Sequence, residues 1–133
     1  MLKKIMIVDD DPDITLSVKQ GLEKLEKEYE VTCVNSGIDC LETLKNKNIP
    51  DLILLDIMMP GMNGWELLNR IREKHEWSDI PIVFLTAKTD SFSKTFGKTV
   101  SLDYIEKPFE IKDLERRIYD IIKKTGKDKA YLQ

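Results

Sequence analysis

The chain has 133 residues, of which 41% are hydrophobic and 34% are charged. This composition is typical of one globular domain with its own core and a well-solvated surface. A net charge of −3 at pH 7 argues against nucleic-acid binding by this chain alone. No stretch is apolar and long enough for a membrane span or a secretory signal, so we expect a cytoplasmic protein that does not bind membranes.

Short apolar runs alternate along the chain with segments of helical period. The expected strands are residues 5–8, 30–34, 52–55, 82–85 and a short one at 104–105. The expected helices are residues 14–25, 38–44 after a cap at Ser36, 67–71, a weaker segment that carries Phe92 and Phe96, and 111–122. Strands that alternate with helices imply right-handed crossovers and a parallel sheet covered on both sides. We therefore predict an α/β fold of five strands and five helices, a doubly wound (βα)5 unit.

Polar side chains follow these strands at the points where the strands end. They are Asp9 and Asp10 after the first strand, Asp56 after the third, Thr86 after the fourth and Lys107 after the fifth. The second strand ends in Asn35 and offers nothing acidic. Functional groups of open parallel sheets gather at the carboxyl ends of the strands, so these side chains should converge on one rim.

Such a rim suits a divalent cation and a phosphoryl group. Clustered carboxylates repel one another until a cation such as Mg²⁺ neutralises them. A lysine and a hydroxyl can both contact phosphoryl oxygens. Taken singly, each residue also has an ordinary explanation, such as acidic residues that suit a helix N-terminus. Asp11, directly before Pro12, is itself interpreted as a helix N-cap, with Asp13 in the first turn.

Four motifs in this order resemble the receiver domain of two-component response regulators. They are IVDD near the N-terminus, LLDIMMPGMNG around Asp56, FLTA at Thr86 and DYIEKPF at Lys107. The resemblance covers about residues 3–124, so we place a receiver domain at 1–124 and expect a polar, frayed tail at 125–133. It implies a flavodoxin-like sheet with strand order 2-1-3-4-5.

The resemblance also implies a role for each acidic residue. Asp56 is expected to accept a phosphoryl group from a sensor histidine kinase or a phosphotransfer protein. Asp10 is expected to bind Mg²⁺ directly and Asp9 largely through water. Asp56 and the backbone carbonyl of Met58 complete the expected metal site.

Further residues are expected to respond to phosphorylation. Lys107 would pair with Asp56 and then with the phosphoryl oxygens. Thr86 would move to bond the phosphoryl group, and Tyr104 would follow it inward as the switch aromatic. The Lys107–Pro108 bond is expected to be cis. The protein would drive an unknown downstream partner rather than turn over an external substrate, and phosphorylation-dependent homodimerisation stays open, as does whether it acts alone or as part of a longer regulator.

The chain departs from the family pattern between Thr86 and Lys107. Val100-Ser101 stands where the family has Gly-Ala, and Gly97 could end the fourth helix early. Beside the acceptor, Met58 and Lys88 occupy positions that influence the hydrolytic water, and neither readily accepts a hydrogen bond from it. We therefore expect slow self-dephosphorylation, over minutes or longer.

The sequence also leaves two rival functions open. A Mg²⁺ phosphohydrolase of the haloacid-dehalogenase type would use Asp9-Asp10-Asp11 as its Asp-x-Asp pair, but it leaves Asp56 without a role. A flavodoxin-type flavin protein would need a Ser/Thr/Gly phosphate loop after the first strand, and none is present.

Three smaller expectations concern packing. Cys33 and Cys40 lack CxxC spacing, so free buried thiols are favoured over a disulfide. His75 and Trp77 are interpreted as exposed residues at a helix end. Met58 and Met59 are interpreted as loop packing, with a partner surface as the alternative.

Overall fold

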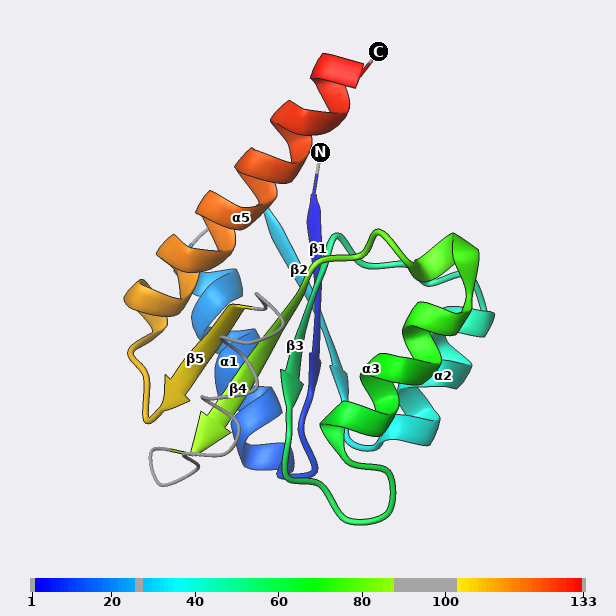
Figure 1. Ribbon diagram of the computed structural model, residues 1–133. Helices are drawn as coiled ribbons and strands as arrows, with labels where there is room; N and C mark the ends of the chain where they lie inside the picture. The colour runs from blue at the N-terminus through cyan, green and yellow to red at the C-terminus, as the bar shows by residue number, and fades with distance from the viewer. Residues whose placement is uncertain (1, 26–27, 88–102, 133) are drawn as a thin grey trace.

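The strands form one parallel sheet in a computed structural model that describes residues 2–25, 28–87 and 103–132, with only the helix path for 126–132. The strands are β1 (Lys3–Val8), β2 (Tyr29–Val34), β3 (Leu52–Asp56), β4 (Ile82–Ala87) and β5 (Asp103–Lys107). Their order is β2-β1-β3-β4-β5, and all four pairings are parallel (Figure 1). The predicted fold class and strand order are confirmed.

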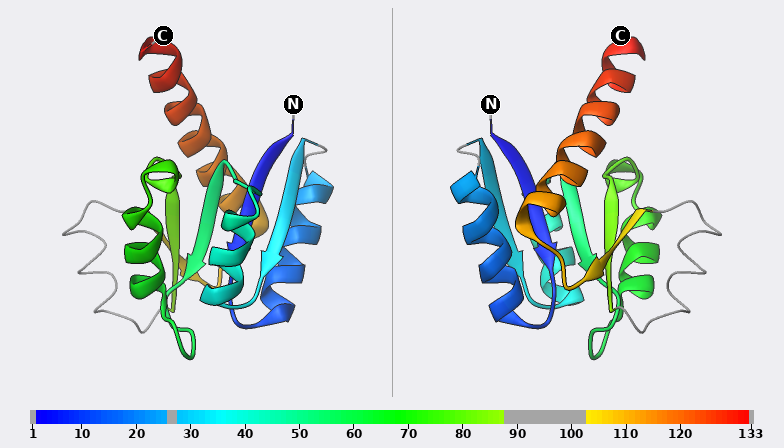
Figure 2. Two further views of the ribbon diagram at one scale, coloured as in Figure 1. Left: turned by 90° about the vertical axis from the view of Figure 1, so that its right-hand side faces the viewer. Right: turned by 90° about the vertical axis from the view of Figure 1, so that its left-hand side faces the viewer.

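Helices cover both faces of the sheet. They are α1 (Pro12–Leu25), α2 (Gly37–Lys45), α3 (Gly64–Glu73) and α5 (Ile111–Leu132), with a short 3₁₀ helix η1 (His75–Trp77). Helices α1 and α5 lie on one face, and α2 and α3 lie on the other (Figures 1 and 2). The helix predicted around Phe92 and Phe96 and the departures at Gly97 and 100–101 lie outside the described residues.

The core has two layers because strand side chains alternate between the faces of the sheet. Ile5 and Ile7 of β1 pack in the layer beneath α1 and α5, whereas Met6 and Val8 pack in the layer beneath α2 and α3. The central strand β3 is buried along its whole length. Apolar runs without polar alternation are therefore the correct signature of these strands.

Side-chain caps fix where α2 and α3 begin. The Ser36 hydroxyl accepts a hydrogen bond from the backbone N–H of Asp39 at 3.1 Å, so the predicted cap of α2 is confirmed. Asn63 caps α3 in the same way through the N–H of Glu66 at 2.9 Å.

Two packing expectations and the expected end of the last helix need correction. Trp77 is buried, at 4% exposure, in the core layer beneath α2 and α3. The expectation was wrong because the regular helical period ends before the 3₁₀ helix η1, which redirects the chain. His75 is exposed as expected. Helix α5 runs to Leu132 through the expected tail, since residues 123–132 contain no proline and are mostly good helix formers. Met59 is buried as loop packing, but the side chain of Met58 is 69% exposed.

Both cysteines are free, as predicted, and Cys40 is buried whereas Cys33 is only partly so. Burial raises the pKa of the Cys40 thiol to about 12. No helix in the described part of the chain is both long enough and apolar enough to cross a bilayer.

Candidate functional site

The polar residues at the ends of β1, β3 and β5 meet at one edge of the sheet. One carboxylate oxygen from each of Asp9, Asp10 and Asp56 lies within 4.8 Å of the other two. Asp9 is 1% exposed and Asp56 is 6% exposed, whereas Asp10 is on the surface. The structure therefore gathers the three predicted carboxylates into one cluster, called the acidic pocket below, and Asp10 is its exposed member.

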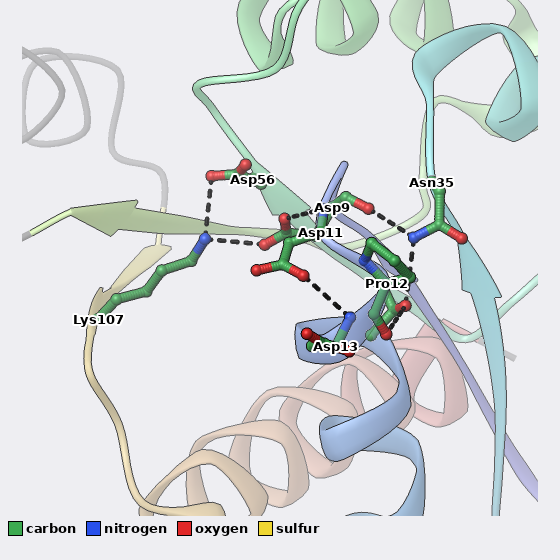
Figure 3. A network of polar contacts seen from close by, with 8 residues as sticks. Asp9, Asp11, Pro12, Asp13, Asn35, Asp56 and Lys107 are labelled. Atoms are coloured by element: carbon green, nitrogen blue, oxygen red, sulfur yellow. Dashed lines mark hydrogen bonds and ion pairs between the residues drawn. The ribbon is translucent and has the colours of Figure 1, made fainter.

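Lys107 links two of these carboxylates (Figure 3). Its ammonium group donates to Asp9 Oδ2 at 2.8 Å and to Asp56 Oδ1 at 3.3 Å. Burial lowers the pKa of Lys107, but the hydrogen bond to Asp9 and the negative charges of both aspartates outweigh it and raise the pKa overall. Lys107 is therefore a fixed positive charge at the pocket.

The surroundings of Asp56 disfavour a negative charge on its carboxylate. Burial and the neighbouring charge of Asp9 raise the pKa of Asp56 from 3.8 to about 6, although Lys107 acts in the opposite direction. One ammonium group does not balance three carboxylates. The side chains gathered here thus carry excess negative charge.

The β1–α1 turn holds Asp9 rigidly. Asp9 Oδ1 accepts a hydrogen bond from the N–H of Asp11 at 3.0 Å, while its other oxygen is bound by Lys107. Asp11 Oδ1 accepts from the N–H of Asp13 at 2.9 Å, which confirms Asp11 as the cap of α1. Asp11 therefore has a structural role as a helix cap, which the phosphohydrolase alternative does not require.

Asn35 contacts the β1–α1 turn. Asn35 had no predicted role, because its side chain is not acidic. Its side-chain amide donates to the backbone carbonyl of Asp9 at 2.8 Å and to Thr15 Oγ1 at 3.2 Å (Figure 3). Its position at the end of β2 could have indicated this contact, since a polar residue at the end of a strand beside β1 can reach the β1–α1 turn.

The backbone of Asp56, at the end of β3, lies close to the backbone at the start of α3. The N–H of Gly64 donates to the carbonyl of Ile57 at 2.8 Å and closes the β3–α3 loop. A Cβ atom on Gly64 would lie 2.7 Å from the backbone oxygen of Asp56 and 2.8 Å from Ile57 Cα. Only glycine lets α3 begin this close to the end of β3.

The remaining predicted residues have different surroundings. Thr86 is 1% exposed, and its hydroxyl has no hydrogen-bond partner among the described residues. Tyr104, on β5, is half-buried against the α2/α3 core layer. The Lys107–Pro108 peptide bond is cis. Lys88, expected to influence phosphoryl lifetime, lies outside the described residues.

The donor set fits a hard divalent cation. Mg²⁺ prefers carboxylate and carbonyl oxygens and keeps several waters, and the described residues place three carboxylates together at a partly open pocket. Asp10 and Asp56 have the better access to such a cation, because both oxygens of Asp9 already accept hydrogen bonds.

The comparisons with known proteins agree with this geometry. The sequence profile of the response regulator receiver domain matches residues 5–119. Solved structures with the same fold include a receiver domain protein (CheY-like) from Methanospirillum hungatei, with 34% identity, a TM-score of 0.80, and coverage of 94% of this chain and 98% of that chain.

Two further structures are similar. The receiver domain of the Francisella response regulator 1452 has 30% identity, a TM-score of 0.78, and coverage of 92% of this chain and 98% of that chain. The chemotaxis protein CheY4 of Vibrio cholerae has 29% identity, a TM-score of 0.79, and coverage of 90% and 98%. With the profile spanning most of the chain, this protein belongs to the response regulator receiver domain family, whose members are phosphoryl-accepting signalling switches.

Proposed function

We propose that Asp56 accepts a phosphoryl group, in a Mg²⁺-dependent reaction, from a sensor histidine kinase or a phosphotransfer protein. The observation that carries this proposal is the setting of Asp56: a carboxylate at the end of β3, close to Asp9 and Asp10 and 3.3 Å from the Lys107 ammonium group. Asp9 shares the burial, the ion pair with Lys107 and the acidic neighbours, but each of its two carboxylate oxygens already accepts a hydrogen bond, whereas Lys107 contacts Asp56 through Oδ1 alone.

The proposed reaction is an in-line displacement at phosphorus. A carboxylate oxygen of Asp56 attacks the phosphorus of a phosphohistidine, the P–N bond breaks, and the electron pair stays on the imidazole nitrogen. The product is an aspartyl phosphate. Lys107, already within reach of Asp56, offsets negative charge on the phosphoryl oxygens.

Asp10, Asp56 and the backbone carbonyl of Met58 would hold Mg²⁺, with Asp9 acting largely through water. When bound, the cation offsets negative charge on the transferring group. The protein residues keep the acceptor in place. Asp9 and Lys107 anchor each other, and the β3–α3 loop holds the backbone of Asp56.

Phosphorylation is proposed to shift the protein between two conformations. A dianionic group on Asp56 offers an acceptor to the buried Thr86 hydroxyl, and Tyr104 moves inward with Thr86. The altered surface then binds a downstream partner. The protein releases its own phosphoryl group slowly and does not turn over an external substrate.

The test is labelling with acetyl phosphate or a histidine kinase, followed by intact-mass spectrometry. Asp56→Asn should abolish the added phosphoryl group, and EDTA should abolish it in the unaltered protein. Asp39→Asn, the same change at an exposed position in α2, is the matched control and should label normally. Persistent labelling of Asp56→Asn would move the acceptor elsewhere, and steady turnover of a phosphate ester would favour a phosphohydrolase.

A further inference from the structure

The side-chain amide of Asn35 connects β2 to β1 and α1 through hydrogen bonds at the edge of the acidic pocket. Asn35 follows β2 directly. Its amide donates one hydrogen bond to the Asp9 carbonyl at the end of β1, at 2.8 Å, and another to the Thr15 hydroxyl in α1, at 3.2 Å. The Thr15 hydroxyl in turn donates to the carbonyl of Pro12 at 3.1 Å. The amide therefore spans the turn from its first residue to the first turn of the helix (Figure 3).

This tie completes the set of contacts that fix Asp9. Its carboxylate is held by the N–H of Asp11 and by Lys107, and its backbone carbonyl is held by Asn35. Asp10 stands between Asp9 and Asp11, and both of these neighbours are held by hydrogen bonds. The direction of the exposed Asp10 side chain is thus set by a turn that Asn35 closes.

Asn35 does not contribute to core packing. Its side chain is exposed, and it belongs to neither core layer. Its truncation therefore removes two hydrogen bonds without opening a cavity. Thr15 is buried, but valine has nearly the same shape as threonine and lacks the hydroxyl.

We infer that Asn35 is a positioning residue for the divalent cation: its amide holds the β1–α1 turn in the form that presents Asp9 and Asp10 to Mg²⁺. The inference rests on the proposed function, because it assumes that the pocket binds Mg²⁺. Residues that orient metal ligands from behind change metal affinity by about 10- to 100-fold when they are replaced.

The experiment measures the Mg²⁺ dissociation constant of the full chain by isothermal titration calorimetry. Asn35→Ala should weaken binding by about tenfold. Thr15→Val should weaken it less, since Asn35 keeps its bond to Asp9. Thr15→Ser keeps the hydroxyl and should bind Mg²⁺ like the unaltered protein. Asn48→Ala, the same truncation at an exposed residue between α2 and β3, should also bind normally.

A second readout distinguishes positioning from a structural role. Urea unfolding in EDTA reports the stability of the metal-free fold, and a purely structural Asn35 would lower that stability while leaving the Mg²⁺ dissociation constant unchanged. Unchanged Mg²⁺ binding by Asn35→Ala, or weakening by Thr15→Ser equal to that of Thr15→Val, overturns the inference. Failure of the unaltered protein to bind Mg²⁺ overturns the proposed function instead.

Discussion

Replacing Asp56 with asparagine should stabilise the metal-free protein, although it abolishes the proposed function. The pKa of Asp56 rises from 3.8 to about 6, and each pKa unit is worth about 1.4 kcal/mol, so its ionised form costs the fold roughly 3 kcal/mol at neutral pH. Asparagine fills nearly the same space without a charge. The raised pKa already includes the attraction between Asp56 and Lys107, and Lys107 keeps Asp9 as a partner after the substitution. The gain at neutral pH should therefore be about 2–3 kcal/mol.

The stabilisation by Asp56→Asn should depend on pH. Between pH 3.8 and about 6 the folded protein binds a proton at Asp56 that the unfolded chain has released, so the folded state loses stability as pH rises through this window. The advantage of Asp56→Asn should be complete above about pH 6 and vanish near pH 4. Urea unfolding in EDTA, followed by circular dichroism at both pH values, measures it. Asp39→Asn should give no such gain, since its charge suits the α2 N-terminus. An Asp56→Asn protein no more stable than the unaltered one at pH 7.5 would refute the reasoning.

Three further outcomes are expected. Gly64→Ala should destabilise the fold by about 1–3 kcal/mol in urea unfolding, because the new Cβ meets backbone atoms at the end of β3; Gly61→Ala, with open space but a φ of +75°, should cost less. Glu23 has its pKa lowered chiefly by a hydrogen bond from a β2 backbone amide, so its stabilising effect should be present above pH 4.5 and lost as pH falls further, whereas Glu23→Gln should lack this loss. Phosphorylated protein in Mg²⁺ should decay over minutes or longer, because the thioether of the exposed Met58 is a weak acceptor, and a half-life of seconds would contradict this.

The strands could be predicted closely from sequence because buried parallel strands are continuous apolar runs. The runs at residues 5–8 and 52–55 fall within β1 and β3, and each ends at the aspartate that the pocket uses. Once the strands are known to be parallel, their carboxyl ends must share one edge. The gathering of Asp9, Asp10 and Asp56 therefore followed from strand ends alone.

The sequence could not predict what depends on neighbours in space. Trp77 was misplaced because a 3₁₀ turn breaks the helical period that separates buried from exposed positions. Asn35 was missed because its partner is a backbone carbonyl on β1, and strand order came from the family resemblance rather than from periodicity. The extent of α5 also escaped prediction, since the polar composition of its last turns resembles that of a frayed tail.

If Asp56 accepts a phosphoryl group as proposed, Thr86 and Lys107 would supply free energy for the conformational change. The Thr86 hydroxyl is buried without a partner among the described residues, and a hydrogen bond to the phosphoryl group would relieve the cost of about 1–3 kcal/mol that a buried hydroxyl without a partner carries. Lys107 is shared between Asp9 and Asp56, and a new charge-assisted hydrogen bond from it would contribute about 1.5–3 kcal/mol. Together these approach the roughly 5.5 kcal/mol that moves a two-state equilibrium from one conformation almost fully to the other. The proposed aspartyl phosphate at Asp56 would engage both groups at once, and their combined contribution would favour the phosphorylated conformation.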